Sequence, residues 1–212
     1  MEEKSLYHMR KDYSPAPLDP AHLEQDPFLQ FAKWFDQALE FEQMEANAMI
    51  VSTCDLSLRP SSRVVLLKSY SREGFVFFTN YHSKKGRDLT ANPNISLLFF
   101  WPATMRQVRI EGRAHKVEEA ISQEYFSGRP RESKASSALS RQSEPLFEKE
   151  QFNDNVKNLI ESDQEILRPT HWGGYVVVPV SFEFWQGGIG RAHDRYLYKK
   201  GPKGWNISPL YP

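Results

Sequence analysis

Apolar side chains recur at helical spacing in one segment near the start of the chain. Between Pro27 and Phe41, aromatic and aliphatic residues fall at positions i, i+3, i+4 and i+7, which predicts an amphipathic helix. The segment "SKKGRDLTANP" opens on an N-capping serine, Ser83, and ends at Pro93, which predicts a second, short helix. The segment "EEAISQEYFSGRP" predicts a third helix, and residues 133–165 are polar and mostly helical by composition.

Between these helices the apolar runs are short and bounded by turn residues, as is typical of strands. The run "AMIVSTC" predicts one strand, and "SSRVVLLKSY" and "GFVFFTN" flank the turn-like "SREG" and predict a hairpin. A second hairpin is predicted for "ISLLFFW" and "RQVRIEGRAHKV", joined through "PATM". The last strands are predicted in "GGYVVVPVSFEFWQGG", "RYLYKK" and "GWNISPL".

Strands and helices do not alternate regularly, which disfavours a doubly wound parallel sheet. The predicted fold class is therefore α+β and mainly antiparallel β, with a barrel to which helices are attached. Residues 1–26 are polar and contain several prolines, and we interpret them as an N-terminal arm or flap. Residues 27–212 are predicted to form a single domain.

Composition narrows the class of protein. Lys plus Arg and Asp plus Glu both number 27, so no global basic bias favours a nucleic-acid binder. No apolar stretch approaches the ~20 residues of a membrane span, and the first 14 residues lack the apolar core of a signal peptide. The single cysteine, Cys54, lies in an apolar run and is predicted to be a buried small residue. We therefore expect a cytoplasmic protein without disulfides.

Several common catalytic patterns are absent from the sequence. It contains no GxGxxG or GxxxxGK[ST] phosphate loop and no GxSxG nucleophile elbow. The six histidines show no HExxH or comparable spacing, so no metal site is predicted. The chemistry must therefore be sought among the cations and their polar neighbours.

Cationic and polar residues gather in a few segments of this neutral chain. Lys84 and Lys85 follow Ser83 at a predicted helix N-terminus, where lysines and free amides together can bind an anion. Arg129 and Ser133 lie in "YFSGRPRES" and could grip a phosphate, because a guanidinium fork matches phosphate oxygens. Solvated surface charges are the alternative interpretation of each feature alone. Their number suggests two separate anionic sites.

The segment "FWQGGIGRAHDR" carries three potential cations in alternation. If the chain is extended from Arg191 onward, Arg191, His193 and Arg195 project from one face. Clustered cations repel one another unless an anion lies among them. We therefore predict a binding site here, although a lone histidine of this kind could also be structural.

The order and approximate spacing of these motifs resemble one known family. The matching segments are "RVVLLK", "FFTN", "SKKG", "RQVRIEG", "YFSGRPRES", "SRQS", "WGGY", "EFWQGG" and "RAHDR". From about Met9 to the C-terminus the chain resembles the pyridoxine/pyridoxamine 5′-phosphate oxidases. The resemblance implies a split β-barrel that binds FMN and forms a homodimer with FMN sites shared across the interface. It also implies oxidation of pyridoxamine or pyridoxine 5′-phosphate to pyridoxal 5′-phosphate by O₂, with release of H₂O₂, and of ammonia from the amine.

The resemblance also implies roles for individual residues. For FMN it implies Arg63 and Lys85 at the phosphate, with Lys84, Gln142 and Ser143 nearby, and contacts along the flavin from Val64, Val65, Leu66, Leu67, Lys68, Phe78 and Thr79. Gln107 would address the isoalloxazine ring or the ribityl chain, and Trp185 and Arg195 would reach FMN from the partner subunit. For the substrate it implies Lys68, Tyr125, Arg129 and Ser133 at the phosphate, and Arg191 and His193 as catalytic residues at the pyridine ring. The flap over the substrate would contain Arg10, Lys11, Asp12 and Tyr13.

The chain departs from the family pattern in a few places. Ala192 stands where leucine is usual, Lys84 replaces a common arginine, and the chain ends in "PLYP" rather than "RLAP". Residues 135–140 read "ASSALS" and lack the usual glycine and large aromatic. One alternative is another split-barrel flavoprotein, such as a flavin reductase-like or haem-utilisation relative, against which "YFSGRP" and "RAHDR" argue. The other is a non-catalytic module that binds FMN or pyridoxal phosphate, which the departure in residues 135–140 keeps open.

Overall fold

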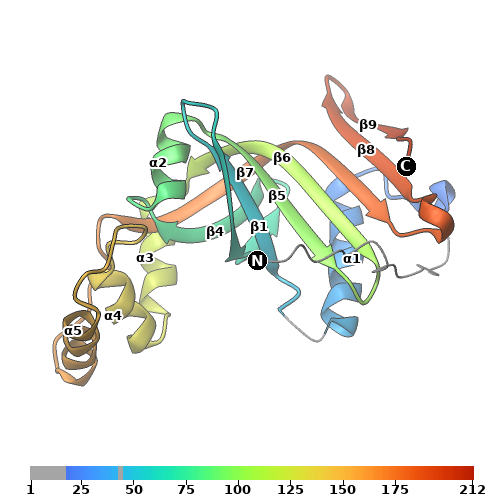
Figure 1. The fold of residues 1–212 in the computed structure, drawn as a ribbon. Coiled ribbons are helices and arrows are strands. Elements are labelled where there is room, and N and C mark those ends of the chain that lie inside the picture. The colour runs from blue at the N-terminus through green and yellow to red at the C-terminus, as the bar shows by residue number, and fades with distance from the viewer. Residues whose placement is uncertain (1–17, 43–44) are drawn as a thin grey trace, which may run out of the picture. The chain divides into compact units, whose positions relative to one another are not determined.

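The structure is a computed structural model that describes residues 18–42 and 45–212. Figure 1 shows how its elements follow one another along the chain. The α-helices are α1 (Pro27–Phe41), α2 (Lys84–Ala91), α3 (Glu119–Ser127), α4 (Arg131–Leu139) and α5 (Lys149–Glu161), and two short 3₁₀ helices span Pro20–His22 and Ile189–Arg191. The strands are β1 (Ala48–Cys54), β2 (Pro60–Leu66), β3 (Ser69–Ser71), β4 (Gly74–Asn80), β5 (Asn94–Trp101), β6 (Arg106–Lys116), β7 (Trp172–Gln186), β8 (Asp194–Gly201) and β9 (Gly204–Pro209).

Neighbouring strands form one hydrogen-bonded sheet, in the order β2-β1-β5-β6-β7-β4-β3, with β8 paired to β7 and β9 to β8. The pairs β1–β2, β3–β4, β4–β7, β7–β8 and β8–β9 are antiparallel, as the sequence predicted. The described residues divide into two compact units, one of residues 18–42, 45–46, 98–110 and 181–212, and one of residues 47–97 and 111–180. We call them the α1 unit and the cavity unit. The prediction of a single domain over 27–212 stays a prediction.

The predicted amphipathic helix anchors the core of the α1 unit. Asp26 caps α1 by accepting the N–H of Phe28 at 2.9 Å, and Pro27 occupies the first helical turn, where its missing N–H is not needed. The buried face of the helix presents Phe31 and Trp34. Phe31 packs edge-on against Phe99 at 5.1 Å between ring centroids, and Trp34 packs edge-on against Phe184 at 5.3 Å. The spacing of the apolar positions therefore predicted this element correctly.

In the cavity unit, the first predicted hairpin is only partly correct. β2 pairs with β1, with Val51 opposite Arg63, whereas only the short β3 forms the hairpin with β4. The backbone explains the difference, because the N–H of Leu67 donates to Asn47 O and the N–H of Lys68 to Val76 O, each at 2.8 Å. The chain thus changes neighbours between two consecutive residues. The adjacency of β5 and β6 agrees with the second predicted hairpin.

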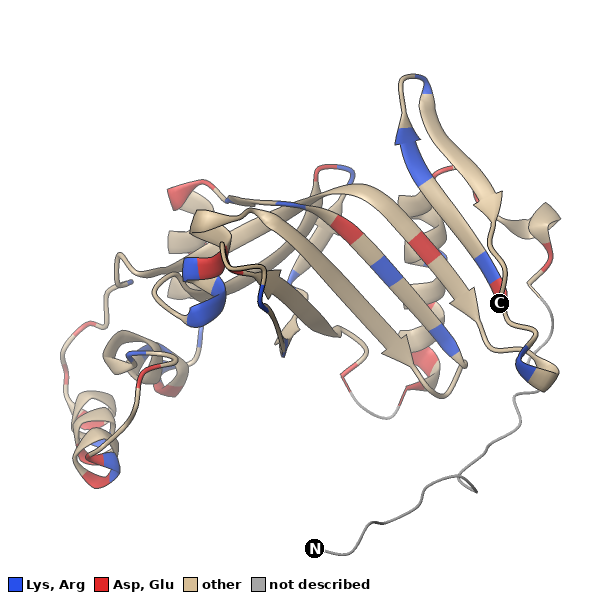
Figure 2. Cartoon of the chain, turned by 45° about the horizontal axis from the view of Figure 1, so that its top comes forward, with Lys and Arg blue, Asp and Glu red and all other residues tan. Residues whose placement is uncertain are grey.

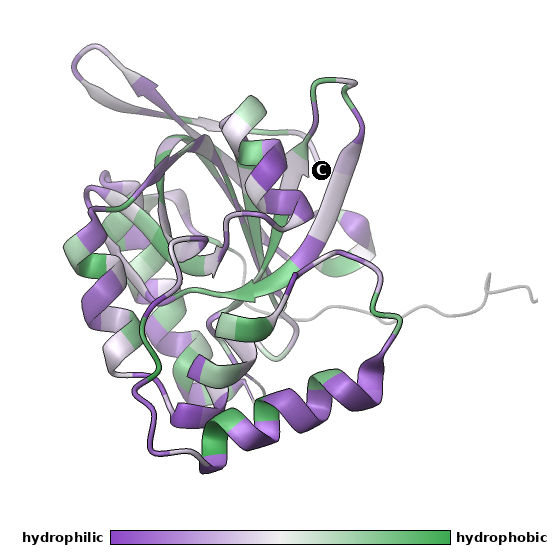
Figure 3. Ribbon diagram, turned by 90° about the vertical axis from the view of Figure 1, so that its left-hand side faces the viewer, coloured by the Kyte–Doolittle hydropathy of each residue, from purple (hydrophilic) through white to green (hydrophobic). Residues whose placement is uncertain are grey.

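Helices α3, α4 and α5 surround a small apolar cluster in the same unit. Phe126, Ala135, Ile166 and Trp172 are its buried members. Helix α5 is mostly hydrophilic, as Figure 3 shows, and contributes Val156, Leu159 and Ile160 from one side. Their spacing of three and four residues is that of one helical face, so the cluster ties α5 to the unit. Cys54, predicted to be buried, is half-buried at the end of β1.

Charges of both signs are spread over the ribbon in Figure 2, in keeping with the equal counts of 27. None of the helices in the described part of the chain combines the length and the apolar character that crossing a membrane requires.

Candidate functional site

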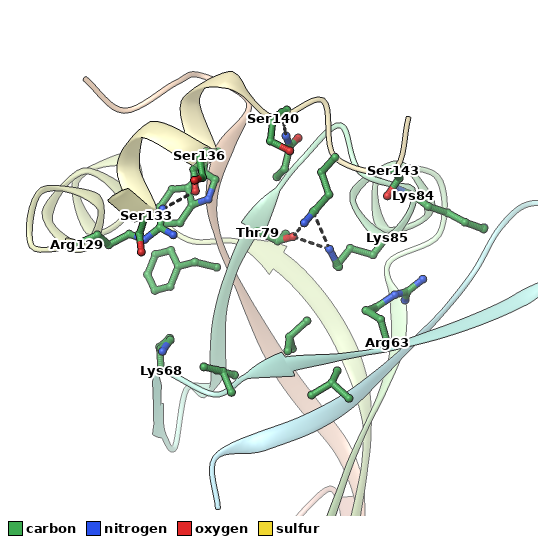
Figure 4. Close-up of a pocket in the computed structure, with 18 of the residues that line it drawn as sticks. Arg63, Lys68, Thr79, Lys84, Lys85, Arg129, Ser133, Ser136, Ser140 and Ser143 are labelled. Atoms are coloured by element: carbon green, nitrogen blue, oxygen red, sulfur yellow. Dashed lines mark hydrogen bonds between the residues drawn. The ribbon is translucent and has the colours of Figure 1, made fainter. Parts of the chain in front are cut away.

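A cavity of about 1080 Å³ lies in the cavity unit, between β2, β4 and α2 on one side and α3 and α4 on the other. Cavities of this size are typical of small-molecule and cofactor sites. Fourteen of the residues predicted for binding line it: Arg63, Val64, Val65, Leu66, Lys68, Phe78, Thr79, Lys84, Lys85, Tyr125, Arg129, Ser133, Gln142 and Ser143. Figure 4 shows that the cations fall into two groups. We call them the α2 end (Arg63, Lys84 and Lys85) and the α4 end (Lys68 and Arg129, with Tyr125 and Ser133).

Lys85 is the buried cation of the α2 end, with 7% of its surface exposed. Its Nζ donates to Thr79 Oγ1 at 2.8 Å and to Gln142 Oε1 at 3.0 Å, bonds that Figure 4 marks, and to Ser83 Oγ at 3.4 Å. All three acceptors are neutral. A buried charge without a counter-ion is costly, and such a group lies ready for an anion.

The electrostatics of Lys85 agree with this geometry. Burial, and to a smaller extent the positive charge of Arg63, lower the pKa of Lys85 to about 8. Burial also lowers the pKa of Arg63, although the charge of Asp88 opposes that shift. Arg63 and Lys85 therefore share one partly desolvated corner of the cavity, where burial and the charge of Arg63 both disfavour the charged form of Lys85.

Arg63 and Lys84 are held by a hydrogen-bonded network around Asp88. Arg63 Nη1 donates to Thr53 Oγ1 at 2.8 Å, and Thr53 in turn donates to Asp88 Oδ2 at 2.7 Å. Lys84 Nζ lies 3.1 Å from Asp88 Oδ1, so its charge is balanced by a carboxylate, unlike that of Lys85. The backbone N–H of Lys84, at the N-terminus of α2, donates to Ser143 Oγ at 3.1 Å.

The sequence places these groups through a tight helix start. Ser83 caps α2 by accepting the N–H of Gly86, which confirms the predicted N-cap. A Cβ on Gly86 would lie 2.1 Å from the carbonyl oxygen of Tyr81. Only glycine therefore lets the first turn of α2 approach the end of β4 closely enough to bring Lys85 beside Thr79.

The α4 end is more open and contains no buried lysine. Lys68 is exposed, and Arg129 is half-buried just beyond α3. Arg129 Nη1 donates to Ser137 Oγ at 2.7 Å, and its Cζ lies 4.6 Å from the centroid of the Trp172 ring. Burial lowers the pKa of Arg129, against a smaller opposing effect of Tyr125. Its described partners are neutral, so this cation too has no counter-ion among the residues that the structure describes.

Three aromatic rings form a wall beside the α4 end. Tyr125 stacks on Phe78 with ring centroids 4.0 Å apart, and Phe78 stacks on Trp172 at 5.5 Å. Trp172 belongs to the sequence motif "WGGY", but the sequence alone predicted no role for it. Sequence reasoning also missed the lining residues Ser61, Asn80, Arg87, Pro130, Ser136, Ser137, Ser140 and Phe152. The spacing of Ser133, Ser136, Ser137 and Ser140 along one helical face was the available signal.

The remaining predicted residues lie elsewhere. Leu67 is buried, with 4% of its surface exposed, and does not line the cavity. Gln107, Trp185, Arg191, His193 and Arg195 belong to the α1 unit. The predicted flap residues Arg10, Lys11, Asp12 and Tyr13 lie outside the described residues.

In the α1 unit, a buried carboxylate organises two arginines. Glu183 is 3% exposed and accepts from Arg195 Nε at 2.9 Å. Arg109 Nη2 lies 2.6 Å from the other oxygen of Glu183. The His193 ring is 4.7 Å from that of Trp185, and its Nδ1 accepts the N–H of Gly188 at 3.1 Å.

The predicted alternation of Arg191, His193 and Arg195 on an extended strand is wrong. Ile189–Arg191 form a 3₁₀ turn, and β8 starts only at Asp194. Gly190 has a φ of 62° and Arg191 a φ of 67°, so both adopt the left-handed region. For an arginine this conformation is uncommon and strained, which the spacing of charges could not reveal.

Solved structures identify the class of this fold. PhzG from Burkholderia lata 383, crystallised with tetrahydrophenazine-1-carboxylic acid, is 29% identical, with a TM-score of 0.88 over 94% of this chain and 100% of that one. A pyridoxamine 5′-phosphate oxidase-related, FMN-binding protein from Nostoc punctiforme shares the fold at 13% identity, with a TM-score of 0.73 over 90% of this chain and 100% of that one. The fold is thus a mainly antiparallel split β-barrel with attached helices, as predicted.

Sequence comparison then gives the family. Residues 35–161 match the family described as pyridoxamine 5′-phosphate oxidase, and residues 172–212 match the pyridoxine 5′-phosphate oxidase C-terminal dimerisation region. A protein from Nostoc sp. named pyridoxine/pyridoxamine 5′-phosphate oxidase is 43% identical over 99% of this chain and 100% of its own length. A protein of the same name from Paraburkholderia phytofirmans is 44% identical over 98% of this chain and 99% of its own length. The chain belongs to the pyridoxamine 5′-phosphate oxidase family.

Proposed function

We propose that this protein is an FMN-dependent oxidase that converts pyridoxamine and pyridoxine 5′-phosphates to pyridoxal 5′-phosphate in the cytoplasm, with O₂ as acceptor. The observation that carries the proposal is the cavity with two cationic ends, because cofactor and substrate each bring a phosphate. Family membership supports the chemistry, and the names of the relatives support the substrate. The match to a dimerisation region supports a homodimer.

The residues of the α2 end fit an FMN phosphate. Lys85 is buried among neutral acceptors beside Arg63, so a phosphate dianion would supply the missing counter-charge. The backbone N–H groups at the start of α2 add donors and a favourable dipole. When bound, the flavin supplies the acceptor for two electrons from the substrate. Val64, Val65, Leu66 and Thr79 would line the space along it.

The α4 end fits the substrate phosphate. Arg129 offers guanidinium N–H groups beyond the one bonded to Ser137, and Tyr125, Ser133 and Lys68 line the same end. These residues would bind and orient the substrate so that its reacting carbon meets the cofactor. Positioning of this kind can supply roughly 7–11 kcal/mol of a barrier.

By family membership we assign the pyridine ring to Arg191 and His193. We assign a further FMN contact to Gln107, and two more, made from the partner subunit, to Trp185 and Arg195. An Arg191→Ala protein should keep its flavin and lose about a hundredfold in turnover, equivalent to about 2.7 kcal/mol at the transition state. Measured flavin content and kcat check this. Full turnover in that variant would remove Arg191 from the catalytic residues.

The decisive test of function compares three substrates with the FMN-loaded protein. Pyridoxamine 5′-phosphate should yield equal amounts of H₂O₂, ammonia and pyridoxal 5′-phosphate. Pyridoxamine without the phosphate should lose at least about tenfold in kcat/KM, because a charge-assisted contact is worth ~1.5–3 kcal/mol. The third compound, tetrahydrophenazine-1-carboxylic acid, is the ligand of the PhzG structure. Oxidation of that tricyclic acid alone, or flavin binding without H₂O₂ from any substrate, would overturn the proposal.

A further inference from the structure

Arg129 is held in place by two neutral groups. Its Nη1 donates to Ser137 Oγ at 2.7 Å, and its guanidinium carbon lies 4.6 Å from the Trp172 ring centroid. A second ring, that of Phe126, lies 5.7 Å away. Trp172 is 5% exposed and packs within the apolar cluster, so the indole is a fixed platform. The hydroxyl of Ser137 then selects one direction for the guanidinium above that platform.

Ser137 lies on the face of α4 that lines the cavity. Ser133 and Ser140, one helical turn away on either side, line it as well. Ser137 falls within residues 135–140, where this chain departs from the usual family sequence. The hydrogen bond to Arg129 therefore comes from the segment of α4 in which this chain departs from that sequence.

We propose that Ser137 is a positioning residue, which orients the Arg129 guanidinium toward the phosphate group of the substrate. The inference rests on the proposed function and adds to it a residue that acts through Arg129. The unusual sequence of residues 135–140 would then contribute to substrate affinity through Ser137.

The physical argument concerns the entropy of a long side chain. A free arginine samples many rotamers, and ordering one on binding costs about 0.5–1.5 kcal/mol of affinity. The serine hydroxyl and the indole face order it before the ligand arrives, while only one N–H is used. The other N–H groups stay available for phosphate oxygens, which a guanidinium fork matches in geometry. Partial burial leaves this cation incompletely hydrated, which strengthens its attraction to an anion.

The test is the variant Ser137→Ala, with Ser127→Ala as its matched control. Ser127 is an exposed helical serine near Arg129 that does not line the cavity. We expect Ser137→Ala to raise KM for pyridoxamine 5′-phosphate about tenfold, with kcat and flavin content unchanged. The dissociation constant for pyridoxal 5′-phosphate, measured by quenching of tryptophan fluorescence, should rise by the same factor. Ser127→Ala should match the wild type, and Ser137→Thr, which keeps a hydroxyl, should restore most of the affinity.

A phosphate-specific readout separates positioning from general damage to the cavity. KM for pyridoxamine without its phosphate should be the same in Ser137→Ala and wild type, because Arg129 then has no anion to bind. Wild-type affinity for pyridoxal 5′-phosphate in Ser137→Ala would overturn the inference, as would equal losses for the phosphorylated and unphosphorylated amines. A wild-type protein that binds no pyridoxal 5′-phosphate would instead overturn the proposed function, and the inference with it.

Discussion

The two ends of the cavity carry similar charges but are built differently. At the α2 end, Lys85 is buried in a network of side chains from β4, α2 and the segment after α4. At the α4 end, Lys68 is exposed and Arg129 is half-buried, with one hydroxyl and one indole to hold it. Figure 4 shows the two groups apart in the same cavity.

This difference in burial suits two kinds of ligand: a cofactor that stays bound, and a substrate that binds and leaves in each catalytic cycle. A buried, pre-organised cation has already lost its hydration, so a phosphate placed beside it gains a strong interaction. A more open site binds less tightly and releases its ligand at each turnover. This difference supports our proposal that the cofactor phosphate binds at the α2 end and the substrate phosphate at the α4 end.

The largest effect is expected for Lys85→Met. Losing one partner of a buried charge pair costs about 2–5 kcal/mol, so FMN affinity should fall by about 30-fold or more. The same change should stabilise the FMN-free protein, because it removes a buried cation whose partners in the described part of the chain are all neutral. Isothermal titration with FMN and thermal unfolding without FMN measure both effects. An exposed lysine of α5, Lys149, serves as control, and a lower melting temperature in Lys85→Met would contradict the account.

Arg129→Ala should give the second largest effect, at the other end. Loss of a charge-assisted phosphate contact is worth about 1.5–3 kcal/mol, or roughly 10- to 150-fold in KM for pyridoxamine 5′-phosphate. FMN content should be unchanged. Steady-state kinetics and flavin absorbance separate the two, and equal losses of both ligands would mean that the ends are not separate sites.

A pH dependence should mark the α2 end alone. In the FMN-free protein the pKa of Lys85 is lowered to about 8 from 10.5, so its destabilising charge is fully present below pH 8 and is relieved between pH 8 and 10.5. The free energy of unfolding should therefore gain a contribution from Lys85 that rises with pH in this window. A phosphate favours the protonated lysine, so the FMN dissociation constant should rise by up to about tenfold per unit above pH 8.

Titration of FMN binding between pH 7 and about 9.5 measures this slope. Lys85→Met provides the control, because it lacks the titrating group and should lose the slope. An identical slope in that variant would assign the effect to another residue.

The smallest effect is expected for Lys84→Met, directly beside Lys85 in sequence. Lys84 Nζ lies 3.1 Å from Asp88 Oδ1, and its side chain is partly exposed, so its charge is already balanced and screened. FMN affinity should fall less than about fivefold by titration. A loss comparable to that of Lys85→Met would show that Asp88 does not neutralise Lys84 in the way the structure implies.

The sequence predicted those parts of the molecule that depend on local patterns. Helix α1 follows from the spacing of Phe31 and Trp34, and the start of α2 from the capping residue Ser83. The switch of partners between Leu67 and Lys68 was missed, because it depends on which strands lie on either side. The left-handed backbone at Arg191 was missed for a similar reason, since its charge pattern equally suits a strand.

The residues of the candidate site also fall into those that the sequence predicted and those that it did not. It predicted the cations Lys85 and Arg129, because they lie in recognisable motifs and binding a phosphate requires such residue types. Trp172 and Ser137 were given no role, because each matters through its contact with Arg129, 43 and 8 residues away in sequence. The contact between Trp172 and Arg129 is made only when the chain folds. The hydrogen bond between Ser137 and Arg129 requires that α4 turn Ser137 toward the cavity.

Phosphorus-31 NMR of the protein with FMN and pyridoxal 5′-phosphate tests whether each end of the cavity binds one phosphate, because it observes both phosphates at once. Two bound resonances of equal intensity per chain are expected. Arg129→Ala should abolish only the pyridoxal phosphate signal, and Lys85→Met should shift or abolish that of FMN. A single bound resonance, or two that respond alike to both substitutions, would contradict the assignment of one phosphate to each end of the cavity.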